Sequence, residues 1–150
     1  MSQDLKARAR RIWEEIFPDG DVAALREVLH ADSVDHSARP DEPDGIEGAV
    51  QTMRWLHSVF SDLEFDIHHV IGEGDLVAVH CTMTGRHTGD LMGIPPTNRQ
   101  VATPTIHIVR FRDGKVAEHW AVHNDMVTMR QLGAAPVIPG GPHAPATAAP

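Results

Sequence analysis

Three histidines lie in the last third of the chain, at positions where one sheet can gather them. His107 belongs to T-P-T-I-H-I-V-R-F-R, and His119 and His123 belong to K-V-A-E-H-W-A-V-H. The imidazole titrates near neutral pH, so it can take or give a proton under physiological conditions. Removing a proton next to a carbonyl group needs a base within about 3 Å of that proton and a hydrogen-bond donor for the enolate oxygen. The three histidines therefore indicate proton-transfer chemistry.

The local pattern predicts that these histidines lie on a β-hairpin. Apolar and polar residues alternate over residues 100–111 and again over 115–123, as they do along half-buried strands. The Asp113-Gly114 pair between the two segments favours the positive φ angles of a tight turn. The two strands are therefore expected to be neighbours in an antiparallel sheet.

Side-chain alternation indicates which residues share a face of this hairpin. Strand side chains repeat every two residues, so His119, Ala121 and His123 fall on one face, and His107 shares a face with Thr105. We expect the three histidines to converge on one cavity, with a second histidine or Thr105 as hydrogen-bond donor. The alternative is that some of them are plain strand histidines, exposed or hydrogen-bonded.

Carboxylates near both ends of the predicted fold extend this candidate site. Asp125 follows the second hairpin strand, and Asp35 and His36 occur in V-D-H-S after the second predicted helix. Either aspartate can orient an imidazole by accepting its N–H proton. The alternative for Asp35 and His36 is a polar loop pair that caps or turns the chain.

Large side chains are candidates for contact with a ligand. Trp55 and Trp120 offer flat faces to a polycyclic molecule, and Met53 offers an adaptable wall, although core packing is the commoner role for all three. No metal site is predicted from His119 and His123, because an i, i+4 pair on a strand is separated by roughly 13 Å, far beyond the bonds of about 2 Å that metal ligation requires.

The rest of the chain predicts an α+β domain with one sheet face covered by helices. Apolar residues recur at helical spacing in three N-terminal segments and in a short closing helix, and four segments read as antiparallel strands. The predicted helices cover residues 3–17, 21–29, 46–60 and 126–132, the predicted strands cover 63–67, 76–84, 100–111 and 115–123, and 30–45 and 85–99 are expected to be loops.

Composition narrows the class of protein. The chain has 150 residues and a formal net charge of −8, which suits one domain and disfavours nucleic acid or an anionic membrane as partner. Its single cysteine, Cys81, is expected to be a buried thiol in a reducing, cytoplasmic compartment. Residues 1–133 are expected to form the domain, and the Ala/Pro/Gly-rich residues 134–150 to be disordered or an extended arm.

Several of these segments together resemble one protein family. The loop G-R-H-T-G-D-L-M-G-I-P-P-T, the strand start I-H-I-V-R-F, the turn D-G-K-V, the triplet E-H-W and the ending R-Q-L-G are similar to the SnoaL-like polyketide cyclases of the nuclear-transport-factor-two-like superfamily. The similarity runs from about residue 5 to residue 133 and includes the order of helices and strands.

The resemblance implies a cone-shaped α+β barrel, with three helices on a curved four-stranded antiparallel sheet, in a homodimer or homotetramer. It implies closure of the last ring of an aromatic polyketide by intramolecular aldol condensation, without cofactor or metal. A pocket aspartate is the family's general acid/base and a histidine assists it. The histidine carries over to His107, but the aspartate position falls on Ala121.

The leading hypothesis is a cofactor-independent acid–base enzyme that acts on a small hydrophobic, polyketide-like carbonyl compound. The reaction would be a cyclisation, aldol reaction, isomerisation or dehydration, with His107 assisting and His119 or His123 carrying the proton. Ala121 favours the alternative of a small-molecule-binding protein without catalysis. A hydrolase or hydratase of epoxide type, with pocket carboxylates such as Asp35, Asp66 or Asp125, is a third possibility.

Overall fold

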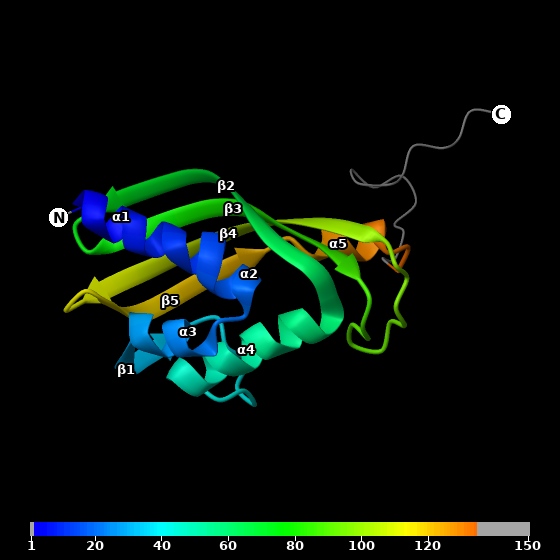
Figure 1. Ribbon diagram of the computed structural model, residues 1–150, viewed down its shortest axis with the longest axis horizontal. Helices are drawn as coiled ribbons and strands as arrows, with labels where there is room; N and C mark the ends of the chain where they lie inside the picture. The colour runs from blue at the N-terminus through cyan, green and yellow to red at the C-terminus, as the bar shows by residue number, and fades with distance from the viewer. Residues whose placement is uncertain (1, 135–150) are drawn as a thin grey trace.

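A computed structural model describes residues 2–134 and confirms an α+β fold (Figure 1). The helices and strands follow one another without an internal repeat. In chain order they are α1 (Ser2–Arg11), the π-helical η1 (Ile12–Ile16), α2 (Phe17–Asp19), α3 (Val22–Val28), β1 (Leu29–Asp35), α4 (Gly45–Val59), β2 (Phe60–Glu73), β3 (Leu76–His87), β4 (Gln100–Arg112), β5 (Lys115–His123) and α5 (Asp125–Gln131).

The sheet is open and mixed, with the strand order β1-β5-β4-β3-β2. Strands β2 to β5 pair antiparallel, whereas β1 runs parallel to β5. The predictions of four strands, of a purely antiparallel sheet and of a cone-shaped barrel are therefore wrong. The β4–β5 hairpin is confirmed, and both Asp113 and Gly114 adopt positive φ at its turn.

Strand β1 was expected to be part of a polar loop because its sequence, L-H-A-D-S-V-D, has no clean apolar alternation. It forms because β5 offers a free edge. Leu29 pairs with Val116 and Asp35 pairs with His119, and the backbone N–H of His36 donates to the carbonyl oxygen of His119 at 2.8 Å. Tertiary pairing thus overrides weak local preference, and it brings Asp35 alongside the hairpin.

The N-terminal helical part is longer and more divided than predicted. The first expected helix continues past residue 17 to Asp19, as α1, η1 and α2 in succession, so the helix count differs from the expectation. Pro18 lies in the first turn of α2, and it has no N–H to donate to a carbonyl oxygen of the preceding η1 turn. Gly20, at a φ of 64°, ends the segment.

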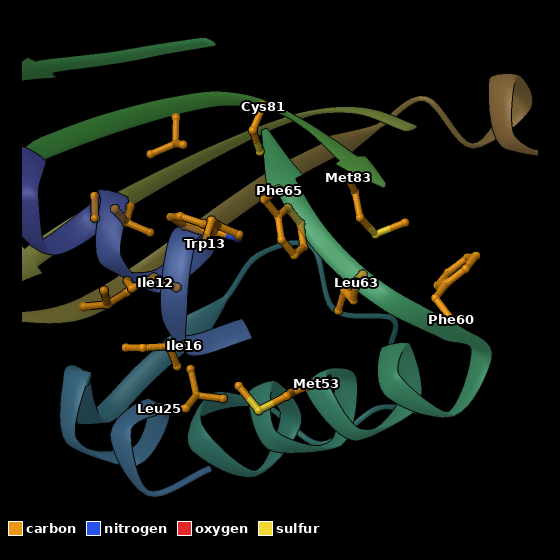
Figure 2. Close-up of a cluster of buried hydrophobic side chains, with 14 of the residues drawn as sticks. Ile12, Trp13, Ile16, Leu25, Met53, Phe60, Leu63, Phe65, Cys81 and Met83 are labelled. Carbon is orange, nitrogen blue, oxygen red and sulfur yellow. The ribbon is translucent and has the colours of Figure 1, made fainter. Parts of the chain in front are cut away.

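The core lies between the helices and the inner face of the sheet. The N-terminal helix crosses that face, and α3 and α4 close one side of it (Figure 1). Inward residues alternate along β3 and β4 with outward ones, as the pleat requires. Figure 2 shows Trp13 and Phe65 lying between the helical layer and the strands. Cys81 is fully buried there, as predicted.

A bulge in β2 brings two adjacent histidines, His68 and His69, to the same face of the sheet. Side chains of adjacent residues in a regular strand point to opposite faces. The register shifts between Ile67 and His69, and both histidines lie near His80 on the outer face of the sheet. The extra residue of a bulge changes which side chains share a face.

The disordered or extended arm predicted at residues 134–150 lies outside the described residues, apart from Ala134. Within residues 2–134 no helix is long and apolar enough to cross a membrane.

Candidate active site

A largely apolar cavity of about 810 Å³ lies between the helices and the inner face of the sheet. Its size falls in the range of pockets that hold small organic ligands. Polar side chains from β1, β4 and β5 gather on part of its wall, and aromatic and aliphatic side chains supply most of the rest. The latter include Trp13, Phe17, Leu56, Phe60, Phe65, Met83 and Leu91.

Three predicted residues form one hydrogen-bonded chain on this wall. Asp35 at the end of β1 contacts His119 on β5, with 3.0 Å between Oδ1 and Nδ1. His119 contacts His107 on β4, with 3.0 Å between Nε2 and Nδ1. The parallel pairing of β1 with β5 and the antiparallel pairing of β5 with β4 create this row. We call Asp35, His119 and His107 the proton relay.

The order of hydrogen bonds assigns the tautomers of the relay. An ionised carboxylate can only accept, so His119 must donate its Nδ1 proton to Asp35. The Nε2 atom of neutral His119 is then an acceptor, so His107 must donate from Nδ1. A neutral His107 consequently carries an unprotonated Nε2, which is the form that a general base needs.

Electrostatics favour an ionised Asp35 and a neutral His107. Burial alone would raise the pKa of Asp35, but the hydrogen bond and charge of His119 and the backbone N–H of Ser37 outweigh it and lower that pKa. Burial lowers the pKa of His107 well below its ordinary value, and positive charge on His119 or His123 lowers it further. At neutral pH the relay therefore begins at an ionised Asp35 and ends, through His119, at a neutral His107.

The free end of the relay has no hydrogen-bond partner. His107 is 5% exposed, and its Nε2 atom is buried and unpaired. An unsatisfied buried acceptor is costly unless a ligand completes it. The imidazole is also stacked on Trp13, with ring centroids 4.3 Å apart. His107 is one of the residues that line the cavity, and Nε2 is its nitrogen without a hydrogen-bond partner.

His123, Asp125 and Ala121 also line the cavity. The His123 ring meets the His107 ring edge-on, with centroids 5.5 Å apart. Burial lowers the pKa of His123, and the nearby carboxylate of Asp125 opposes that shift. Although much of its side chain is exposed to solvent, His123 thus adds a second imidazole beside the relay whose neutral form is favoured.

Ser37 fixes the strand position that carries Ala121. Its hydroxyl oxygen accepts the Ala121 N–H at 2.6 Å, and the same hydroxyl lies 3.3 Å from the Ala121 carbonyl oxygen. A second side chain on the cavity wall, Ser33, has a buried hydroxyl without a partner. Sequence reasoning missed both serines, because nothing in D-S-V-D-H-S distinguishes them from loop residues.

Four other predicted residues lie away from the cavity wall. Thr105 is buried against Cys81, with 3.1 Å between the hydroxyl oxygen and Sγ. Met53 is 1% exposed in the core. His36 and Trp120 stack on each other, with centroids 4.7 Å apart. None of these four residues lines the cavity in the described part of the chain. Trp55, which was also predicted, does line it.

Within the described part of the chain, no group of three or more His, Cys, Asp or Glu residues is arranged to hold a metal ion. The imidazoles of the relay use their facing nitrogens to bind each other and Asp35. The arrangement can therefore move a proton between the cavity and Asp35 with protein groups alone.

The sequence profile of the SnoaL-like polyketide cyclases matches residues 7–132. The chain belongs to this family. The match spans every helix and strand from η1 to α5, together with the second half of α1. The family resemblance noted in the sequence is thereby confirmed.

Relatives within the family include named cyclases. The aklanonic acid methyl ester cyclase DnrD of Streptomyces peucetius is 30% identical over 123 residues, which are 79% of this chain and 84% of DnrD. The nogalonic acid methyl ester cyclase of Streptomyces nogalater is 30% identical over 113 residues, which are 68% of this chain and 84% of that protein.

Solved structures have the same fold. TsrD from Streptomyces laurentii has a TM-score of 0.81 and 28% identity, over 89% of this chain and 98% of TsrD. In the present chain, the relay residues lie on β1, β4 and β5. They are next to Ala121, the position at which the family resemblance implies an aspartate.

Trp13 falls in the first predicted helix, and sequence reasoning missed its contact with His107. The signal in the sequence is helical spacing of apolar residues, which is the same for a core tryptophan and for one that covers a site. Only the tertiary fold distinguishes the two.

Proposed function

We propose that this SnoaL-like protein closes a ring of an aromatic polyketide by a cofactor-independent intramolecular aldol reaction. The observation that carries the proposal is the proton relay, which ends in an unpaired, buried Nε2 atom of His107 on the cavity wall. The named relatives, cyclases of aklanonic and nogalonic acid methyl esters, support a polycyclic carbonyl substrate.

The relay supplies each proton transfer of such a reaction. Nε2 of His107 takes a proton from the carbon next to a carbonyl group, and the resulting imidazolium shares its charge through His119 with Asp35. The enolate carbon then forms the new carbon–carbon bond to a second carbonyl of the same molecule. The alkoxide oxygen recovers the proton from His107, so product and substrate are isomers and the enzyme returns to its starting state.

His123 completes this proposed site as a hydrogen-bond donor. Its ring is adjacent to that of His107, and the lowered pKa keeps it neutral, so it can donate one N–H to the enolate oxygen without competing for the proton. The apolar residues of the cavity wall lower the local polarity, which strengthens such hydrogen bonds.

The buried base also indicates what kind of carbon it deprotonates. Burial lowers the pKa of His107, so His107 is a weak base. A weak base removes protons efficiently only from an acidic carbon. The nucleophilic carbon of the substrate is therefore proposed to lie between two electron-withdrawing groups, as in a β-keto ester.

A chromatographic turnover assay tests this function. Purified protein is incubated with a panel of aromatic polyketide methyl esters, beside the His107→Gln variant. Conversion to a ring-closed product of unchanged mass, lost in the variant, supports the proposal. Ala121 favours one other candidate, a binding protein without catalysis, and tight ligand binding without product from wild type would establish that candidate instead.

We also propose that the protein assembles as a homo-oligomer, a dimer or tetramer, through the outer face of its sheet. Ile106 and Ile108 on β4 pair in register with Val122 and Trp120 on β5, so their outward side chains form one continuous band. Ile106 is 46% and Val122 is 74% exposed. The band contains no carboxylate, so two chains of net charge −8 can meet there without direct repulsion.

A further inference from the structure

Trp13 occupies an unusual stretch of the N-terminal helix. It lies in η1, where the helix changes from α to π geometry for five residues. Short π-helical stretches are rare and are frequent at functional sites. Trp13 is 3% exposed, and it lies beside Phe65 between the helix and the sheet (Figure 2).

The indole covers the terminal imidazole of the relay face to face. The ring centroids of Trp13 and His107 are 4.3 Å apart and the planes are inclined by 28°. His119 is farther away, with centroids 6.3 Å apart. A cation within about 6 Å of an indole centroid is attracted by the negative face of the ring. Trp13 therefore contacts the relay residue that becomes charged when a proton is taken from the cavity.

Few other groups favour a charged His107. The imidazoles of His119 and His123, both on β5, would repel it if they were protonated. Asp35 contacts His119 rather than His107, and Asp125 follows His123 at the end of β5. Within residues 2–134, the hydrogen bond of the His107 side chain goes to another imidazole and not to a carboxylate.

Neighbours of Trp13 on the helix do not supply a compensating charge either. Glu14 pairs with Arg10 at 2.7 Å and Glu15 with Arg11 at 3.5 Å, and all four side chains are more than 40% exposed. These ion pairs are on the solvent side of the helix, whereas Trp13 is on the buried side. Among the described residues, the indole is thus a second group, besides the accepting Nε2 atom of His119, whose direct contact stabilises the cationic form of His107.

We propose that Trp13 is a positioning residue of the proton relay, whose indole face holds the plane of the His107 ring and stabilises the imidazolium formed during proton transfer. The role rests on the proposed function, because it matters for turnover only if His107 changes charge in the reaction. The charge stabilisation itself is a property of the free protein and can be measured without a substrate.

The experiment is an NMR titration of the histidine side chains in wild type, Trp13→Phe and Trp13→Leu. Leucine keeps an apolar side chain but removes the aromatic face, and phenylalanine keeps a weaker one. We expect the pKa of His107 to fall by about 1 unit in Trp13→Leu, which corresponds to roughly a tenfold change in the protonation equilibrium. Trp13→Phe, which also serves if the leucine variant fails to fold, is expected to give a smaller fall.

Ile16→Val is the matched control, since Ile16 is buried in the same π-helical turn and the change removes one methylene without touching an aromatic face. A fall in Trp13→Leu or Trp13→Phe with no change in Ile16→Val supports the inference. An unchanged or raised pKa of His107 in the Trp13 variants, or an equal fall in Ile16→Val, overturns it.

Activity then separates this inference from the proposed function. If wild type converts a polyketide ester, the acid limb of kcat/KM is expected to move to lower pH in Trp13→Leu by the same amount as the pKa of His107, which a merely structural loss would not cause. If the limb stays while the pKa moves, the role of Trp13 in turnover is wrong. If wild type has no turnover, the proposed function fails, and the titration still decides whether Trp13 stabilises charged His107.

Discussion

Asp35 and His119 are 84 positions apart in the sequence, and their contact decides which nitrogen of neutral His107 carries the proton. The carboxylate accepts the Nδ1 proton of His119, His119 accepts the Nδ1 proton of His107, and Nε2 of His107 remains free. A base is thus assembled beside Ala121, where the family resemblance implies an aspartate. In the proposed function, the relay takes over the role of that aspartate.

Replacing Asp35 by asparagine should reverse the donor and acceptor roles along the hydrogen bonds of the relay. An amide can donate its N–H to Nδ1 of His119, which turns His119 Nε2 into a donor and leaves His107 with its proton on the cavity side. Loss of a general base costs roughly 10²- to 10⁴-fold in rate, so kcat/KM for ring closure should fall within that range. Asp32→Asn, on the same strand and 83% exposed, is the control and should retain full activity.

The histidines also predict how stability depends on pH. Burial lowers the pKa values of His107 and His123 below their ordinary value of 6.5. Between the folded-state values and 6.5, the unfolded chain binds more protons, so the free energy of unfolding should rise with pH and level off above about 6.5. Asp35, with its lowered pKa, adds stability that is present above its unfolded value and is lost as pH falls through its folded value.

Urea unfolding at several pH values between 5 and 8 measures this dependence. In His107→Gln the rise in unfolding free energy over that window should be smaller than in wild type, because one group that resists protonation is gone. An identical rise in both proteins would show that His107 titrates normally in the folded state.

At the element scale, β1 positions the only carboxylate of the relay, and α4 packs against β1. Gly48, in the first turns of α4, lies so close to the preceding loop that an added Cβ would be 2.1 Å from the Pro43 carbonyl oxygen. This close approach keeps the chain between β1 and α4 in place, and with it the end of β1 that carries Asp35.

Gly48→Ala should therefore destabilise the protein, although alanine is the better helix former by about 1 kcal/mol. Overpacking against backbone typically costs about 1–3 kcal/mol, and denaturant unfolding should register a net loss in that range. Arg54→Ala, an exposed change in the same helix, should stay within about 0.5 kcal/mol of wild type. A stabilised Gly48→Ala variant would mean that the loop moves away freely.

The helices and strands that could be predicted from the sequence are those with short-range sequence patterns. The β4–β5 hairpin and α4 follow from period-two alternation, from the Asp113-Gly114 turn and from helical spacing, all of which are local signals. Strand β1 has no such signal, because its pairing with the β5 edge forms it. The bulge at His68 likewise depends on the register with β3.

The candidate site follows the same division. The convergence of His107, His119 and His123 could be predicted because all three are on one hairpin. The link to Asp35 could only be suggested, since it depends on the unpredicted strand. The stacking of Trp13 could not be predicted, because it depends on where the helix crosses the sheet.

At the scale of the whole molecule, the two faces of the open sheet carry different features. The inner face carries the relay and the cavity, and the outer face carries the band of Ile106, Ile108, Trp120 and Val122. The same two strands serve both faces, so assembly through the outer band would stiffen the strands that hold His107 and His119.

Val122→Glu should disrupt the proposed assembly. It places a carboxylate in the centre of the apolar band, where two copies would bring like charges together and remove them from water. Sedimentation velocity should show a shift from dimer or tetramer to monomer. Met92→Glu, at a similarly exposed methionine outside the band, should leave the assembly unchanged; monomeric wild type would contradict the proposal.

The most direct test of the relay is deuterium exchange at the nucleophilic carbon of a substrate analogue. The analogue keeps the activated carbon between two electron-withdrawing groups but lacks the second carbonyl, so it cannot cyclise. Proton NMR in D₂O then follows loss of the carbon-bound proton with wild type, His107→Gln and Asp32→Asn. We predict acceleration by wild type and Asp32→Asn and only background exchange with His107→Gln. Equal acceleration by His107→Gln, or none by wild type with the analogue bound, would contradict proton abstraction by His107.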